Sequence, residues 1–113
     1  MTLFGFTLGP WGALALAGLL EVAWASGFKF IGPQRPFISA VVVAAMIASF
    51  YFLWVATQRL PIGTAYAVWT GIGAVGTAIV GIVLLGESAN MMRVLSILLI
   101  AIGILGLKLA PHS

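Results

Sequence analysis

The sequence predicts an all-α integral membrane protein with four transmembrane helices. Of its 113 residues, 63% are apolar and only 6% are charged, and the mean hydropathy is +1.23. Soluble domains carry charge on roughly a quarter of their residues, so this composition excludes a soluble globular domain. Because a spanning helix needs about 20 apolar residues, the chain accommodates four spans with short loops, as a single domain over residues 1–113.

Charged residues and prolines mark where these helices begin and end. Three windows carry no charge, residues 36–58, 60–86 and 94–107, and the window 1–28 holds a single acid. Proline is excluded from helix interiors, and every proline of the chain lies at an expected boundary. Arg93 and Lys108 can extend to the interfaces, which brings the short last window to membrane length. The expected helices are residues 11–30, 37–57, 62–84 and 91–109.

Several classes of function are excluded by residues that the chain lacks. There is no cysteine, so disulfides, thiolate catalysis and zinc sites built on sulfur are absent. The five basic residues are too few and too scattered to form a nucleic-acid-binding surface. The expected loops are only a few residues long, which leaves no extramembrane site. We therefore expect a function within the lipid bilayer, without a cofactor or a metal, and not an enzyme.

The basic residues are almost evenly divided between the two membrane surfaces. Alternating helices place Lys29, Arg35 and Arg93 on one side, and Arg59 and Lys108 on the other. Asymmetry of Lys and Arg sets the direction of insertion, so a chain without it has no strong preferred orientation. Two interpretations stay open: insertion in both orientations, which permits an antiparallel homodimer, or one dominant orientation with charge numbers too small to reveal it.

Glu21 is the one acid within a predicted span. It lies about ten residues into the first helix, near the bilayer midplane, where an unpaired carboxylate costs at least ~2.5 kcal/mol. Intramembrane acids typically mark ion sites, so we expect Glu21 to bind a proton or a cation. The structural alternative is a protonated Glu21 that donates a hydrogen bond to another helix, or one paired to a base.

Aromatic residues near this acid indicate an organic cation. At helical spacing Gly18 and Trp24 share a face with Glu21, so an open space and an indole are expected beside the carboxylate. Tyr66 and Trp69 share a face of the third helix, and aromatic faces attract cations. Interfacial aromatic belts are the alternative interpretation. Ser49, in the middle of the second helix, could hydrogen-bond the acid or its own helix backbone.

The third helix is rich in small residues that let helices approach closely in lipid. Gly63, Ala67 and Gly71 form one ladder at four-residue spacing, and Gly73, Thr77 and Gly81 form another. The cluster of Gly71, Gly73 and Gly76 also weakens the helix, which favours a hinge there, although glycine is common in transmembrane helices generally. The second acid, Glu87, is expected in a solvated loop near Arg93.

Two sequence runs carry a family resemblance. GLLEVAW at residues 18–24 and LPIGTAYAVWTGIGA at residues 60–74 closely resemble the small multidrug resistance family. The WTGIGA run at 69–74 and the GESAN loop at 86–90 are similar to its guanidinium-exporter (SugE/Gdx) branch. The resemblance extends over residues 11–110. The first loop, residues 30–36, departs from it because it lacks the Gly-Phe-Ser/Thr-Arg pattern common in relatives.

The resemblance implies an antiparallel, dual-topology homodimer in the bacterial inner membrane, which exports guanidinium ion in exchange for protons. Glu21 would bind the cation and the protons. Trp24 and Ser49 would hydrogen-bond and position it, while Tyr66 and Trp69 would line the site. On the fourth helix, Ser96 and Gly103 lie seven residues apart on one face and would form the dimer contact.

Three hypotheses for function follow. The first is a guanidinium/proton antiporter. The second is a broad-specificity exporter of quaternary ammonium and other drug cations on the same fold. The third is a small membrane interaction subunit without transport of its own, in which Glu21 would be merely structural.

Overall fold

A computed structural model of the chain describes residues 2–3, 6–7 and 9–111. Its helices are α1 (Pro10–Phe28), α2 (Pro36–Thr57), α3 (Ile62–Leu84) and α4 (Met91–Leu109). Each is long and apolar enough to cross a membrane. The prediction of an all-α protein with four candidate membrane-spanning helices is confirmed.

The helix boundaries differ from the expected ones at three points. α1 and α2 each begin one residue early, with a proline as the first helical residue. The first helical position suits proline because its missing N–H has no partner there in any case. α1 ends at Phe28, two residues before the expected end, and a turn follows it.

A short hairpin precedes the helices and was not predicted. Strand β1 (Thr2–Leu3) pairs antiparallel with β2 (Phe6–Thr7), with Thr2 opposite Thr7. The two-residue strands are too short to produce an alternating pattern in the sequence. They add nothing to the four-helix arrangement.

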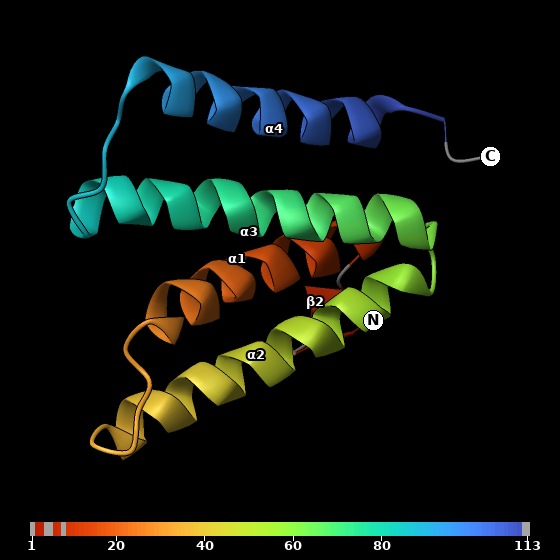
Figure 1. Ribbon diagram of the computed structural model, residues 1–113. Coiled ribbons are helices and arrows are strands. Elements are labelled where there is room, and N and C mark those ends of the chain that lie inside the picture. The colour runs from red at the N-terminus through yellow and green to blue at the C-terminus, as the bar shows by residue number, and fades with distance from the viewer. Residues whose placement is uncertain (1, 4–5, 8, 112–113) are drawn as a thin grey trace.

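The four helices lie side by side in the order α2, α1, α3, α4 (Figure 1). α1 packs against both α2 and α3, and α4 packs against α3. The buried core is at the end where α1 begins and α2 is joined to α3, and Figure 1 shows α2 and α3 diverging from that end. The core residues are Ala13, Leu14, Ala17, Ala56, Leu60, Ala65, Val68 and Trp69.

Glycines on α3 bring its backbone close to both neighbouring helices. A Cβ atom on Gly76 would collide with the Val22 side chain of α1. A Cβ atom on Gly71 would lie 2.9 Å from Ile104 Cδ1 of α4. Larger residues at these positions would hold the helices apart. α3 is one helix through residues 71–76, so the hinge suggested by the sequence stays a prediction.

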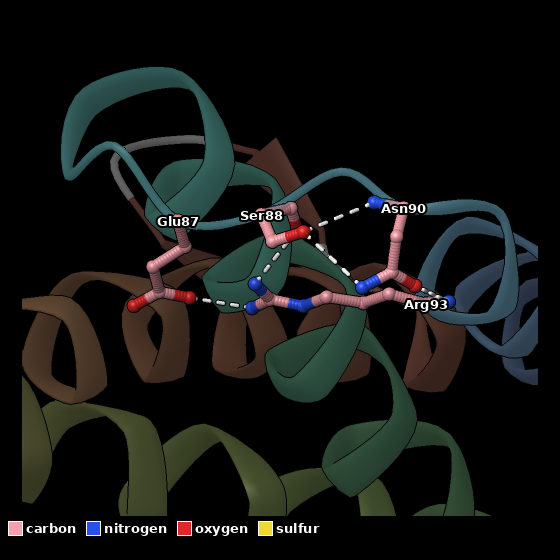
Figure 2. Close-up of polar contacts among 4 residues, drawn as sticks. All are labelled: Glu87, Ser88, Asn90 and Arg93. Carbon is pink, nitrogen blue, oxygen red and sulfur yellow. Dashed lines mark hydrogen bonds and ion pairs between the residues drawn. The ribbon is translucent and has the colours of Figure 1, made fainter.

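Polar contacts order the loop between α3 and α4 (Figure 2). Arg93 Nη2 donates to Glu87 Oε1 at 2.5 Å, and Arg93 Nη1 donates to the Ser88 carbonyl at 2.9 Å. The Asn90 side chain caps α4 by accepting the Arg93 backbone N–H at 2.9 Å. The predicted position of Glu87, in a loop near Arg93, is confirmed.

α4 is the most weakly attached helix of the protomer. It has no buried residue along its length. At its far end Lys108 Nζ lies 5.7 Å from the centre of the Trp11 ring, a cation-π contact with the start of α1. This contact places the start of α1 and the end of α4 on one side, as alternating helices require.

The glycine packing predicts opposite effects for two Gly→Ala substitutions on α3. Gly76→Ala should lower the stability by about 1–3 kcal/mol, because the added methyl overpacks against Val22. Gly63→Ala, where nothing lies within 4 Å of the added methyl, should be neutral or stabilising by up to about 1 kcal/mol. Thermal unfolding of the two variants in the same detergent tests this, and equal melting temperatures would contradict it.

Candidate functional site

The carboxyl group of Glu21 lies against the backbone of α3. A Cβ atom on Gly73 would occupy the positions of Glu21 Oε1, Cδ and Cγ. Gly73 is itself buried. The missing side chain of Gly73 thus provides the space that the Glu21 side chain fills between α1 and α3.

Among the described residues, this carboxyl group has no charged partner. Glu21 Oε1 is buried and accepts no hydrogen bond from the described residues. The two helices packed against α1 contain no Asp, Glu, Lys, Arg or His within their bounds. Within the described part of the chain, the one ion pair joins Glu87 to Arg93. A base paired to Glu21, one of the structural alternatives, is therefore not found there.

A chain of hydrogen bonds joins three helices next to the acid. Trp69 Nε1 donates to Ser49 Oγ at 3.0 Å, and Ser49 Oγ donates to the Ala17 carbonyl at 2.7 Å. In an α-helix that same carbonyl accepts the backbone N–H of Glu21, four residues later. Ser49 is fully buried. It was expected to bond the Glu21 carboxyl or its own helix, and instead it bonds the turn of α1 that precedes Glu21.

Aromatic rings from three helices form a continuous series that starts at Trp24, three residues after Glu21. The Trp24 ring of α1 lies 6.3 Å from that of Phe50 on α2, and Phe50 lies 5.6 Å from Trp69 on α3. Tyr66 continues the series at 5.7 Å from Trp69. The indole Nε1 of Trp24 is buried without a hydrogen-bond partner. Phe50 was not identified from the sequence, since a phenylalanine in an apolar helix carries no distinguishing signal.

Gly18 does not border an open space. A Cβ atom on Gly18 would collide with the Ile72 side chain of α3, which fills the volume beside it. Gly18 is buried and acts as a packing contact between α1 and α3. The spacing within α1 predicted an open space at Gly18 beside the Glu21 carboxyl. That space comes instead from α3, where Gly73 has no side chain.

The remaining predicted residues have other neighbours than the Glu21 carboxyl. Gly71 contacts Ile104 of α4, and Gly76 contacts Val22 of α1. Ser96 and Gly103 are exposed on α4, with nothing within 4 Å of the Cβ position of Gly103. The Ser96 hydroxyl donates to the Met92 carbonyl of its own helix at 2.8 Å. The dimer contact predicted for these two residues would join two protomers, so it stays a prediction.

These groups together suit an organic cation. A carboxyl oxygen without a partner can accept hydrogen bonds from a cationic ligand, and neighbouring aromatic faces attract positive charge. The described residues contain no group of three or more His, Cys, Asp or Glu side chains that could hold a metal ion. The chemistry available at this site is therefore the binding and release of a cation or a proton.

Comparisons with known proteins place the chain among membrane transporters. The family model for the small multidrug resistance protein matches residues 9–100. The guanidinium exporter of Escherichia coli (strain K12) is 60% identical over 103 residues, which are 90% of this chain and 98% of that protein. The guanidinium exporter of Yersinia pseudotuberculosis is 60% identical over 88% of this chain and 97% of its own length, and that of Citrobacter freundii is 58% identical over 90% and 98%. The chain is therefore a multi-pass membrane protein that belongs to the small multidrug resistance family.

Proposed function

We propose that this protein exports guanidinium ion in exchange for protons, and that Glu21 binds both. The observation that carries the proposal is the position of the Glu21 carboxyl: it lies against Gly73 of α3, its Oε1 has no partner among the described residues, and neither α2 nor α3 bears a charged residue. A carboxylate there is costly unless a cation or a proton neutralises it. The cation and the proton therefore compete for one group, which is the basis of exchange.

Guanidinium fits this group better than a cation without N–H donors. It is planar, and its N–H groups can fork onto the two carboxylate oxygens. Trp24, Phe50, Trp69 and Tyr66 supply the aromatic faces against which its plane can stack. The name guanidinium exporter, carried by relatives 60% identical over 90% of the chain, supports the same substrate.

The transporting unit in this proposal is an antiparallel homodimer of protomers that each form one four-helix domain. The exposure of α4 supports this dimer. No residue of α4 is buried within the protomer, and Ser96 and Gly103 lie on its exposed surface. Small residues at such a surface permit close helix contact in lipid. The nearly even distribution of Lys and Arg between the two surfaces supports insertion in both orientations.

Alternating access follows from this symmetry. Two antiparallel protomers are related by an axis in the membrane plane, so exchange of their conformations converts an inward-open state into an equivalent outward-open one. Two Glu21 carboxyls share the central site and titrate as a coupled pair. If one guanidinium replaces two protons, net charge crosses the membrane and transport is electrogenic.

One observation favours a broader exporter of quaternary ammonium cations as a second candidate. The ring series from Trp24 to Tyr66 could hold a cation by its faces alone, without hydrogen bonds. Tetraethylammonium has no N–H donor, and guanidinium is rich in them. A comparison of these two ions therefore separates the candidates.

Substitution of Glu21 tests the proposed function directly. In proteoliposomes on a solid-supported membrane, guanidinium should elicit currents in wild type and none in Glu21→Gln, because the amide cannot carry the charge that binds the cation. Glu87→Gln is the matched control, since Glu87 is the only other acidic side chain and lies in a loop paired to Arg93. It should retain most of the current.

The other outcomes distinguish the remaining hypotheses. Tetraethylammonium currents as large as those of guanidinium would assign the protein to the multidrug exporters. No current with either ion, in protein shown to be dimeric, would point to an interaction subunit. Guanidinium currents that persist in Glu21→Gln would contradict the assigned role of this residue.

Dual insertion is tested by labelling a single introduced cysteine. The chain has no native cysteine, so Pro111→Cys places one thiol just beyond α4. A membrane-impermeant maleimide applied to intact spheroplasts should label about half of the protein, and permeabilisation should make the other half reactive. Labelling from one side only would refute an antiparallel dimer.

A further inference from the structure

Two buried hydroxyl groups near Glu21 have no role in the mechanism described above. Among the described residues, Ser26 Oγ and Thr77 Oγ1 are buried and have no hydrogen-bond partner, like Glu21 Oε1 itself. A hydroxyl in a transmembrane helix usually donates to a carbonyl of the preceding turn, as Ser96 does. An unpaired buried hydroxyl is therefore a group whose partner is absent in this arrangement of the side chains.

Thr77 lies on the same face of α3 as the carboxyl group of Glu21. Trp69, Gly73 and Thr77 follow one another at four-residue spacing, so they are successive neighbours along that face. The Glu21 carboxyl rests on Gly73, the middle position. The Trp69 indole N–H already donates to Ser49, whereas the Thr77 hydroxyl, about 6 Å beyond Gly73 along the helix axis, is unpaired.

Ser26 is less well placed for the same role. It follows Glu21 by five residues on α1, which rotates its side chain by roughly 140° from that of Glu21. The two side chains therefore leave α1 in different directions. Ser26 is a buried unpaired hydroxyl that does not share the face of Glu21, which makes it a suitable control.

We propose that Thr77 is a positioning residue for Glu21, whose hydroxyl donates to the carboxyl when the carboxyl turns along α3 away from Gly73. The inference deepens the proposed function and rests on it. A threonine hydroxyl rotates freely and can donate to either oxygen of a charged or a protonated carboxyl. It holds the carboxyl on the α3 face in the orientation in which cation and proton are exchanged.

The two helices packed against α1 offer no acidic or basic side chain that would compete for this position. The titratable side chains of α2 and α3 are Tyr51 and Tyr66. The Tyr66 ring packs on Trp69, and the Tyr51 ring packs on Phe52 and Trp54. Of the buried donors without a partner in the described part of the chain, Trp24 Nε1 and Ser26 Oγ belong to α1, and the Thr77 hydroxyl is the one on the α3 face that carries the carboxyl.

Infrared difference spectroscopy of the protein in liposomes can test this bond. In a Glu87→Gln background, Glu21 is the single acidic side chain. The infrared band that disappears when Glu21→Gln is added therefore belongs to the protonated Glu21 carboxyl. The variants are Thr77→Val, which keeps the shape and removes the hydroxyl, Thr77→Ser, which keeps the hydroxyl, and the control Ser26→Ala. Guanidinium titrated at fixed pH measures how readily the cation replaces the proton.

Loss of the hydroxyl should change both the band and the titration. In Thr77→Val the C=O stretch should move to higher wavenumber, because its hydrogen bond is lost. The guanidinium concentration that removes half of the band should rise about 3- to 10-fold, because the lost hydrogen bond is stronger to the charged carboxylate than to the protonated carboxyl. Thr77→Ser should restore both values, and Ser26→Ala should leave both at the wild-type level.

Two results would overturn the proposal: a Thr77→Val band and titration identical to wild type, or the same change in Ser26→Ala. If Thr77→Val does not form the folded dimer, Thr77→Ala carries the same test. If guanidinium does not diminish the band in wild type, the proposed function is contradicted. The inference about Thr77 is then still tested, because the position of the band reports the hydrogen bond to Thr77.

Discussion

A carboxyl group within a hydrocarbon layer has no water to bind, so neighbouring side chains or a ligand must supply its partners. At Glu21 the neighbouring helices supply space, through Gly73, and aromatic rings, but no charge. A pre-formed salt bridge would satisfy the acid permanently and leave nothing for a substrate to do. The unsatisfied oxygen is thus a structural cost that a proton or a cation would relieve in the proposed function, and the surrounding packing has to maintain it.

Glycine provides that packing. Gly73 and Gly76 admit the side chains of Glu21 and Val22, so α1 and α3 approach closely on either side of the acid. α2 is attached by the buried core at one end and by Ser49 near the middle. α4 is held mainly at its two ends, by Arg93 and by Lys108, and along its length by contacts such as that of Ile104 with Gly71. The protomer is therefore tightly packed from α2 through α1 to α3, and α4 is its most weakly attached helix.

Much of the fold could be predicted from the sequence because the bilayer imposes few choices. Charges and prolines interrupt the apolar windows, and the helix ends lie within two residues of the expected positions. Glu21 was identifiable as the single acid inside a span. What could not be predicted depends on how the helices rotate against one another: Ile72 fills the space beside Gly18, and the Ser49 hydroxyl points to Ala17. Phe50 and the unpaired hydroxyl of Thr77 gave no signal, since their importance comes from contacts between helices.

The hydrogen-bond chain from Trp69 through Ser49 to Ala17 has a further consequence for the proton exchange proposed above. An indole has one N–H and no lone pair to accept a proton, and a backbone carbonyl already bonded within its helix cannot pass one on. The chain therefore has a fixed direction and closed ends. It can tie α3 to the turn of α1 that precedes Glu21 without forming a path along which a proton could be relayed.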